Sequence, residues 1–169
     1  MVAAPAPDPR IARAWSVLSG VMDPEVPVLS VVDLGIVRDV RAEAGRLAID
    51  LTPTYTGCPA TAAIRLDVEN AIEAAGLGRP AIRLVTSPAW TTDWISQDAR
   101  ARLRDYGIAP PEGAAPRGKR ALFADDPPVA CPRCGSARTR RTSAFGSTAC
   151  KALYACEACA EPFEHFKCI

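Results

Sequence analysis

The sequence predicts an α+β fold, in which helices pack on a small mixed sheet, followed by a four-cysteine zinc ribbon. Three observations support this prediction. Apolar residues in the first hundred positions alternate between helical and strand spacing. A proline-rich stretch then interrupts all periodicity, and two CxxC pairs follow it. We therefore expect an α+β domain over 8–108, a linker over 109–128 and a zinc ribbon over 129–169.

One helix is predicted at the start of the domain. Asp8 offers an N-cap and Pro9 a first-turn proline, and apolar residues then recur at helical spacing as far as Met22. The prolines of the segment 23–27 (DPEVP) must end this helix, because proline has no N–H to donate inside it.

Two strands are predicted next. The β-branched residues of 31–41 indicate a strand with a kink at Gly35, and Ala44-Gly45 supplies a turn. Over 47–52 apolar residues alternate with small or polar ones, which is typical of a half-buried strand.

The rest of the domain is predicted as helix, strand and helix. After a loop over 53–57 a second helix ends at Gly76, and a strand follows over 81–86. A third helix begins at 91–93, presents an apolar face through Tyr106, and stops at Gly107.

Composition excludes several classes of protein. About half of the residues, 49%, are apolar, and the net charge is only +1, so no global field attracts nucleic acid or an anionic membrane. No basic segment followed by an apolar run opens the chain, and no window of about 20 apolar residues spans a bilayer. We expect a cytoplasmic protein, in which cysteine pairs bind metal rather than form disulfides.

Two CxxC knuckles predict one metal site in the ribbon. They are separated by 21 residues, close to the spacing of zinc ribbons, and together offer four thiolates in a closed tetrahedral site. The ligands are Cys131, Cys134, Cys156 and Cys159. Zinc is the expected ion, although four thiolates also suit iron, and two disulfides or four inert thiols are the alternative.

The other ribbon residues of interest are less specific. Cys150 and Cys168 can pack as small apolar residues, bind a second metal or be redox-active. His165 is the only histidine and is expected to pack rather than to ligate. Arg138, Arg140 and Arg141 form a short basic edge, interpreted either as a solvated hairpin face or as a surface for an acidic partner.

Cys58 stands alone at the predicted start of the second helix. It follows Gly57 and precedes Pro59, where unpaired N–H groups and the positive end of the helix dipole stabilise a thiolate. Such a thiolate can ligate a soft metal or act as a nucleophile, or the thiol can simply be buried. The nucleophile interpretation has little support, because the only histidine lies in the ribbon and no general base is evident.

The carboxylates of Asp23 and Glu25 lie in the rigid DPEVP turn. They can join Cys58 at the end of the sheet or serve only in turn and capping chemistry, and the sequence does not decide between the two.

Long motifs resemble a known family. MDPEVPVLSVVDLGIV, LTPTYTGCPA and SPAWTTDWIS, in this order, resemble the SufT-like family of small domains associated with iron–sulfur assembly. The ending STACKALYACEACAEPFEHFKCI, after a CPxCG knuckle, resembles the PaaD branch, which accompanies the bacterial phenylacetyl-CoA epoxidase. The resemblance covers nearly the whole chain and implies a fold like the NifU C-terminal domain.

The resemblance also implies a function. It suggests a non-catalytic accessory or maturation subunit in phenylacetate catabolism, with Cys58, Asp23 and Glu25 handling iron or an iron–sulfur cluster transiently. Partners would be the oxygenase or reductase subunits of the epoxidase. A general iron–sulfur assembly factor and a subunit taking part directly in the monooxygenase reaction are the alternatives. The oligomeric state stays open, with a homodimer as one option.

Overall fold

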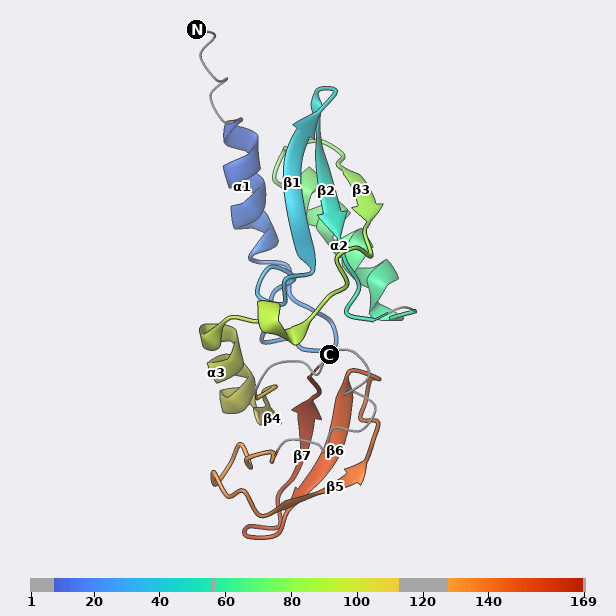
Figure 1. The fold of residues 1–169 in the computed structure, drawn as a ribbon. Coiled ribbons are helices and arrows are strands. Elements are labelled where there is room, and N and C mark those ends of the chain that lie inside the picture. The colour runs from blue at the N-terminus through green and yellow to red at the C-terminus, as the bar shows by residue number, and fades with distance from the viewer. Residues whose placement is uncertain (1–7, 56, 113–127, 169) are drawn as a thin grey trace, which may run out of the picture. The chain divides into compact units, whose positions relative to one another are not determined.

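The computed structural model describes residues 8–55, 57–112 and 128–168, so most of the predicted linker lies outside the described residues. The chain divides into two compact units, residues 1–89 and 90–169, which are described separately (Figure 1). This division differs from the predicted boundary at residue 108. The physical reason is that residues 108–109 hydrogen-bond to a strand of the ribbon.

The first unit is a small mixed sheet with two helices, and the predicted third helix falls in the second unit. Its elements are α1 (Pro9–Leu18), β1 (Val37–Glu43), β2 (Arg46–Leu51), α2 (Ala60–Ala74) and β3 (Ala81–Leu84). The strand order is β1-β2-β3, in which β1 and β2 are antiparallel and β2 and β3 are parallel. The hairpin turn at Ala44-Gly45 has positive φ at both residues, the geometry that matches the twist of the two strands.

The apolar face of this sheet carries the core of the first unit. The fully buried side chains Leu47, Ile49 and Leu51 alternate along β2, while Val68 and Ile72 supply the inner face of α2 and Leu18 that of α1. Asp8 caps α1 by accepting a hydrogen bond from the Arg10 N–H, as the sequence predicts. Gly76, at φ 72°, ends α2.

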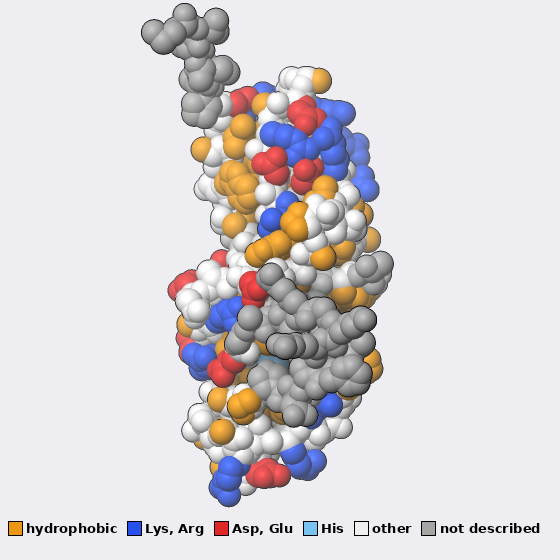
Figure 2. Space-filling view, viewed as in Figure 1, with side chains coloured by type: hydrophobic (Ala, Val, Ile, Leu, Met, Phe, Trp, Pro, Cys, Tyr) orange, Lys and Arg blue, Asp and Glu red, His pale blue; other side chains and the backbone are white. Residues whose placement is uncertain are grey.

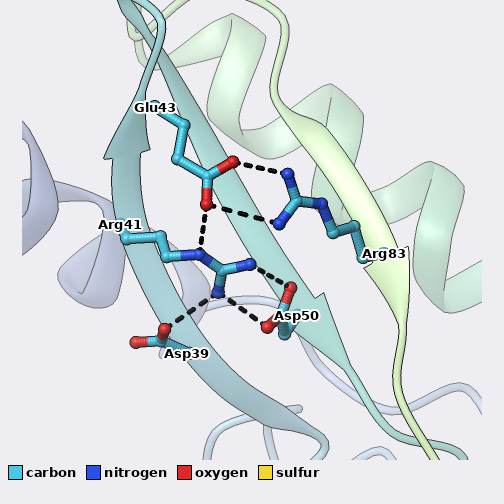
Figure 3. A network of polar contacts seen from close by, with 5 residues as sticks. All are labelled: Asp39, Arg41, Glu43, Asp50 and Arg83. Carbon is cyan, nitrogen blue, oxygen red and sulfur yellow. Dashed lines mark hydrogen bonds and ion pairs between the residues drawn. The ribbon is translucent and has the colours of Figure 1, made fainter.

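The opposite face of the sheet is charged (Figure 3). The Arg41 guanidinium donates to both carboxylate oxygens of Asp50 at 2.6 and 2.9 Å, and also to Glu43 and Asp39. Arg83 on β3 binds Glu43, so the network joins all three strands. The hydrogen bonds from Arg41 and then Arg83 lower the pKa of Glu43. This face is thus adapted to water, and the apolar core lies on one side only.

Two predicted element boundaries in the first unit are wrong. The first helix ends at Leu18 rather than Met22. Residues 31–35 form a turn, and the strand begins only at Val37. The cause of the second error is a local hydrogen-bond cluster, in which Asp33 accepts from the N–H and hydroxyl of Ser30 and donates its own N–H to the Ser30 hydroxyl.

The second unit begins with a short 3₁₀ turn, Thr92–Trp94, followed by α3 (Gln97–Tyr106). The prediction that this helix starts at 91–93 is wrong, because Ser96 is the N-cap and accepts from the Ala99 N–H. Tyr106 is also 55% exposed and therefore not part of the apolar face. Gly107 ends the helix in the left-handed conformation, as predicted.

The ribbon itself is a four-stranded sheet. Its strands are β4 (Ile108–Ala109), β5 (Thr139–Ser143), β6 (Lys151–Cys156) and β7 (Pro162–Phe166), in the order β4-β7-β6-β5. A small core lies on one face and includes two of the predicted ligands; its members are Ala109, Val129, Cys131, Ala152, Tyr154, Cys156 and Phe163. None of the described helices in either unit has the length and apolar character needed to cross a membrane.

Candidate metal centres

The four cysteines of the two knuckles converge in the ribbon. Their sulfur atoms all lie within 4.8 Å of one another. The Sγ atoms of Cys131 and Cys159 are 3.8 Å apart, and those of Cys134 and Cys156 are 3.6 Å apart. These distances are far longer than the roughly 2.05 Å of a disulfide bond, so the four thiols are free.

These separations fit a single tetrahedral ion. A zinc–sulfur bond of about 2.3 Å gives sulfur–sulfur edges of about 3.8 Å in a regular tetrahedron. Both sulfur–sulfur separations are within a few tenths of an ångström of that edge. The residues present therefore fit a four-thiolate metal site, and the same geometry serves zinc or iron.

The two knuckles share one backbone design. In the first, the Cys131 N–H donates to the Ser136 carbonyl at 3.0 Å; in the second, the Cys156 N–H donates to the Glu161 carbonyl at 2.8 Å. Each turn needs a positive φ at the residue after its second cysteine, 72° at Gly135 and 62° at Ala160. Glycine adopts this conformation freely, whereas Ala160 is strained, which indicates that the surrounding structure enforces the turn.

Neighbouring N–H groups and thiols shift the pKa values of two knuckle cysteines in opposite directions. The Cys159 backbone N–H, together with that of Ala158, lowers the pKa of Cys156 to about 7. The Glu161 N–H acts to lower the pKa of Cys159, but the Cys134 thiol, burial and the other thiols outweigh it and raise that pKa to about 12. Arg133 forms an ion pair with Glu161 and so ties the two knuckles together.

The remaining ribbon residues lie outside this cluster. His165 is 5% exposed and meets the Tyr154 ring edge-on at 5.5 Å between centroids. Cys150 is buried beside the Thr148 hydroxyl, 3.0 Å from its sulfur. Cys168 donates to the Glu112 carbonyl, and burial raises the pKa of its thiol.

A second candidate site lies in the first unit, where Cys58 lines a small cavity at the end of β2. Cys58 directly precedes Pro59, the N-cap of α2, and Gly57 before it has φ 85°. The cavity admits the centre of a water molecule over about 20 Å³, enough to hold one small polar species. Its lining is otherwise mostly apolar, and comprises Asp23, Ile36, Leu51, Thr52, Pro53, Thr54, Cys58, Thr61, Ile64 and Leu84.

Asp23 reaches the same cavity as Cys58. Its side chain is 5% exposed, and one carboxylate oxygen accepts the N–H groups of Glu25 at 2.8 Å and Val26 at 2.9 Å. Asp23 thus organises the turn and also lines the cavity. Glu25 is on the same turn but is absent from the cavity lining.

Thr52 is the site residue that the sequence did not reveal. It is 1% exposed, and its hydroxyl has no hydrogen-bond partner among the described residues. An unpaired buried hydroxyl costs about 1–3 kcal/mol, which makes it a group in need of a partner. Its position in an alternating strand predicted a solvated side chain. The only feature of the sequence that pointed to Thr52 as a site residue was its nearness to Cys58 in the LTPTYTGCP motif.

Comparison with known proteins settles the family. The model for the PaaD zinc beta ribbon domain matches residues 115–167, and that for an iron–sulfur cluster assembly protein matches residues 11–80. A protein of Escherichia coli strain K12 described as a subunit of 1,2-phenylacetyl-CoA epoxidase is 48% identical over 162 residues, 95% of this chain and 94% of its own. The chain belongs to the PaaD family. The predicted resemblance is thereby confirmed.

Two further proteins each match about half of this PaaD-family chain. An Fe–S protein maturation auxiliary factor of Porphyromonas gingivalis W83 is 36% identical over 88 residues, 51% of this chain and 83% of the relative. The crystal structure of a DUF59 domain from Bacillus anthracis is 28% identical with a TM-score of 0.51, covering 56% of this chain and 91% of that one. The predicted α+β fold is thus confirmed.

Proposed function

We infer that this chain is a subunit of a phenylacetyl-CoA epoxidase whose role is to help mature or maintain an iron centre of that enzyme, without catalysing the epoxidation. Its partners would be the other epoxidase subunits. The family membership supports the association with the epoxidase, and the iron–sulfur assembly domain over 11–80 supports a role in metal handling. The P. gingivalis relative carries a maturation factor's name.

The observation that carries the proposal is the cavity shared by Cys58, Asp23 and Thr52. Cys58, Asp23 and Thr52 all line one small space, and the Thr52 hydroxyl has no partner among the described residues. Thiolate and carboxylate are both ligands of iron, and the hydroxyl can donate a hydrogen bond to a bound sulfur or oxygen atom. Iron or an iron–sulfur cluster would be cargo here, held by Cys58 and Asp23 and passed on.

The ribbon has a different role in this proposal. Its four cysteines would hold one zinc ion in a closed site, which leaves no coordination position for substrate. Zinc then supplies folding energy to a unit whose core is small. Elemental analysis of the purified full chain should give one zinc per chain. A Cys134→Ala variant should lose that zinc.

The test uses Cys58→Ala in the full chain, with Cys168→Ala as a matched control. Both thiols are half-buried, and neither belongs to the four-cysteine cluster. Epoxidase is produced with the wild type or either variant, then purified and assayed for iron content and activity. We expect Cys58→Ala to yield iron-poor, inactive epoxidase while Cys168→Ala yields normal enzyme. Normal iron content with Cys58→Ala would reject the proposal.

A further inference from the structure

Strand β5 forms one edge of the ribbon sheet. It pairs with β6 alone in the part of the chain that the structure describes. An edge strand turns alternate N–H and C=O groups away from its neighbour, and these groups can accept another strand. Among the described residues, the ribbon sheet therefore has an open edge over Thr139–Ser143.

Unbalanced positive charge lies along this edge. Arg138, Arg140 and Arg141 are all exposed, and for Arg138 and Arg140 no ion pair is found within the described residues. The other basic groups nearby differ, because Arg133 pairs with Glu161 and Lys151 with Glu164. From residue 128 to 168 the sequence has six basic and three acidic side chains, and two of the three acids are used in those pairs.

Exposed apolar side chains occur in the same part of the ribbon. Phe145 follows β5 and is 64% exposed, with the Lys167 ammonium 4.7 Å from its ring centroid. Leu153, which lies opposite Ser143 in the β5–β6 pairing, is 38% exposed. Arginine and aromatic side chains beside an open strand edge are typical of protein interfaces.

We propose that the outer edge of β5, with the side chains of Arg138 and Arg140 (the β5 edge), docks an extended acidic segment of another epoxidase subunit. The segment adds as a strand, its main chain pairing with β5 and its carboxylates facing the arginines. The choice of partner enzyme rests on the proposed function. A polynucleotide fits less well, because the whole chain has a net charge of only +1 and an edge of unpaired amides suits a polypeptide.

On the face shown in Figure 2, separate lysine and arginine side chains lie at the ribbon end with an acidic side chain between them, and basic and acidic side chains are mixed on the first unit. The experiment measures binding of the purified full chain to the purified remaining epoxidase subunits by biolayer interferometry. The double variant Arg138→Glu/Arg140→Glu reverses the charge of the β5 edge, and Arg138→Lys/Arg140→Lys retains it. The control is Arg46→Glu, an exposed arginine on the hairpin of the first unit. Metal content and circular dichroism of each variant establish that the ribbon is intact.

We expect the charge reversal to weaken binding by about tenfold or more, since two attractions become repulsions. The lysine variant keeps both positive charges and Arg46 lies outside the β5 edge, so both variants should stay within about twofold of wild type. Wild-type affinity should fall between about 0.05 and 0.3 M salt, and the reversed variant should lose most of that dependence.

Three outcomes would overturn the proposal. If wild type binds the subunits and the reversal leaves its affinity unchanged, the docking surface is wrong while the proposed function stands. If wild type does not bind the subunits at all, both fall. If the β5 edge instead binds a single-stranded RNA probe, with loss on reversal, the partner is a nucleic acid and the acidic-segment proposal is rejected.

Discussion

The ion pair between Lys151 and Glu164 gives the sharpest test of the ribbon's energetics. The Lys151 ammonium lies 2.7 Å from a carboxylate oxygen of Glu164, and the two side chains are 3% and 23% exposed. The other oxygen of Glu164 accepts the Ser147 N–H at 2.8 Å. Lys151 thus carries the more buried charge of the pair, whereas Glu164 keeps some access to water.

This difference in exposure determines how much stability each substitution should cost and which of the two should cost more. Removing one partner of a fully buried pair costs about 3–5 kcal/mol. Because water reaches Glu164, we expect Glu164→Gln to cost the ribbon about 2 kcal/mol. Lys151→Met leaves a carboxylate that water and the Ser147 N–H can still satisfy, so it should cost less than about 1 kcal/mol.

At acid pH the wild type should lose its higher free energy of unfolding relative to Glu164→Gln. Burial alone would raise the pKa of Glu164, but the hydrogen bonds from Lys151 and Ser147 outweigh it and lower the pKa from its usual 4.5. A carboxylate whose pKa is lower in the folded state stabilises fully above its unfolded pKa and loses that effect as the pH falls through the folded one. The difference between the two proteins should therefore shrink below about pH 4.

Urea unfolding of the metal-loaded full chain, followed through the NMR signals of β6 and β7, measures these free energies at equal free metal concentration. An equal loss of unfolding free energy in Lys151→Met and Glu164→Gln would refute the reasoning. So would a difference in unfolding free energy between wild type and Glu164→Gln that does not change at acid pH.

Three further predictions follow from the cavity, a close contact and the metal. Thr52→Val removes a buried hydroxyl that has no partner among the described residues, so urea unfolding should show about 1 kcal/mol of added stability while epoxidase maturation falls. A loss of stability would show that the Thr52 hydroxyl does have a hydrogen-bond partner. Gly146→Ala should cost the ribbon about 1–2 kcal/mol in the same assay, since its Cβ would lie 2.7 Å from a Glu164 oxygen and the carboxylate is held in place by Lys151 and the Ser147 N–H; an unchanged midpoint would argue against it. A strong chelator should abolish the dispersed NMR signals of β5–β7 and spare those of β1–β3, and ribbon signals that survive metal removal would show that the metal is dispensable.

Much of the fold could be predicted from local sequence because the relevant forces are local. The N-cap at Asp8, the left-handed stops at Gly76 and Gly107, and the hairpin turn at Ala44-Gly45 each depend on a few adjacent residues. The CxxC knuckles belong to the same class, since their spacing alone brings two sulfurs together.

The errors arose where side-chain hydrogen bonds or tertiary contacts override periodicity. The β-branched residues of 31–35 favour a strand, but the Ser30–Asp33 bonds hold them in a turn. Likewise, Thr91 and Ser96 both offer a helix cap, and only the structure shows that α3 begins at the second. Ala109 lies in the predicted linker, yet it pairs with His165 in the ribbon sheet, which no local pattern indicates.

The candidate site of the first unit shows the same limit. Sequence singled out Cys58 from its place before a helix and Asp23 from its turn, and it left open whether the two residues meet. The position of Asp23 depends on a bridge between Met22 and Ser30, and that of Cys58 follows from where β2 ends; hydrophobic periodicity indicates neither feature. Thr52 was missed because the burial of a side chain at a strand end depends on which other segments cover it, and hydrophobic periodicity does not indicate these segments.

The central claim is that Cys58 captures iron in the cavity it shares with Asp23, and iron X-ray absorption spectroscopy tests it most directly. The full chain, with its ribbon site shown to be filled with zinc, is titrated anaerobically with ferrous iron alongside Cys58→Ala and Cys168→Ala. We expect an iron–sulfur scattering path at about 2.3 Å in wild type and Cys168→Ala that vanishes in Cys58→Ala. An unchanged iron–sulfur path in Cys58→Ala, or iron bound only by oxygen in the wild type, would contradict it.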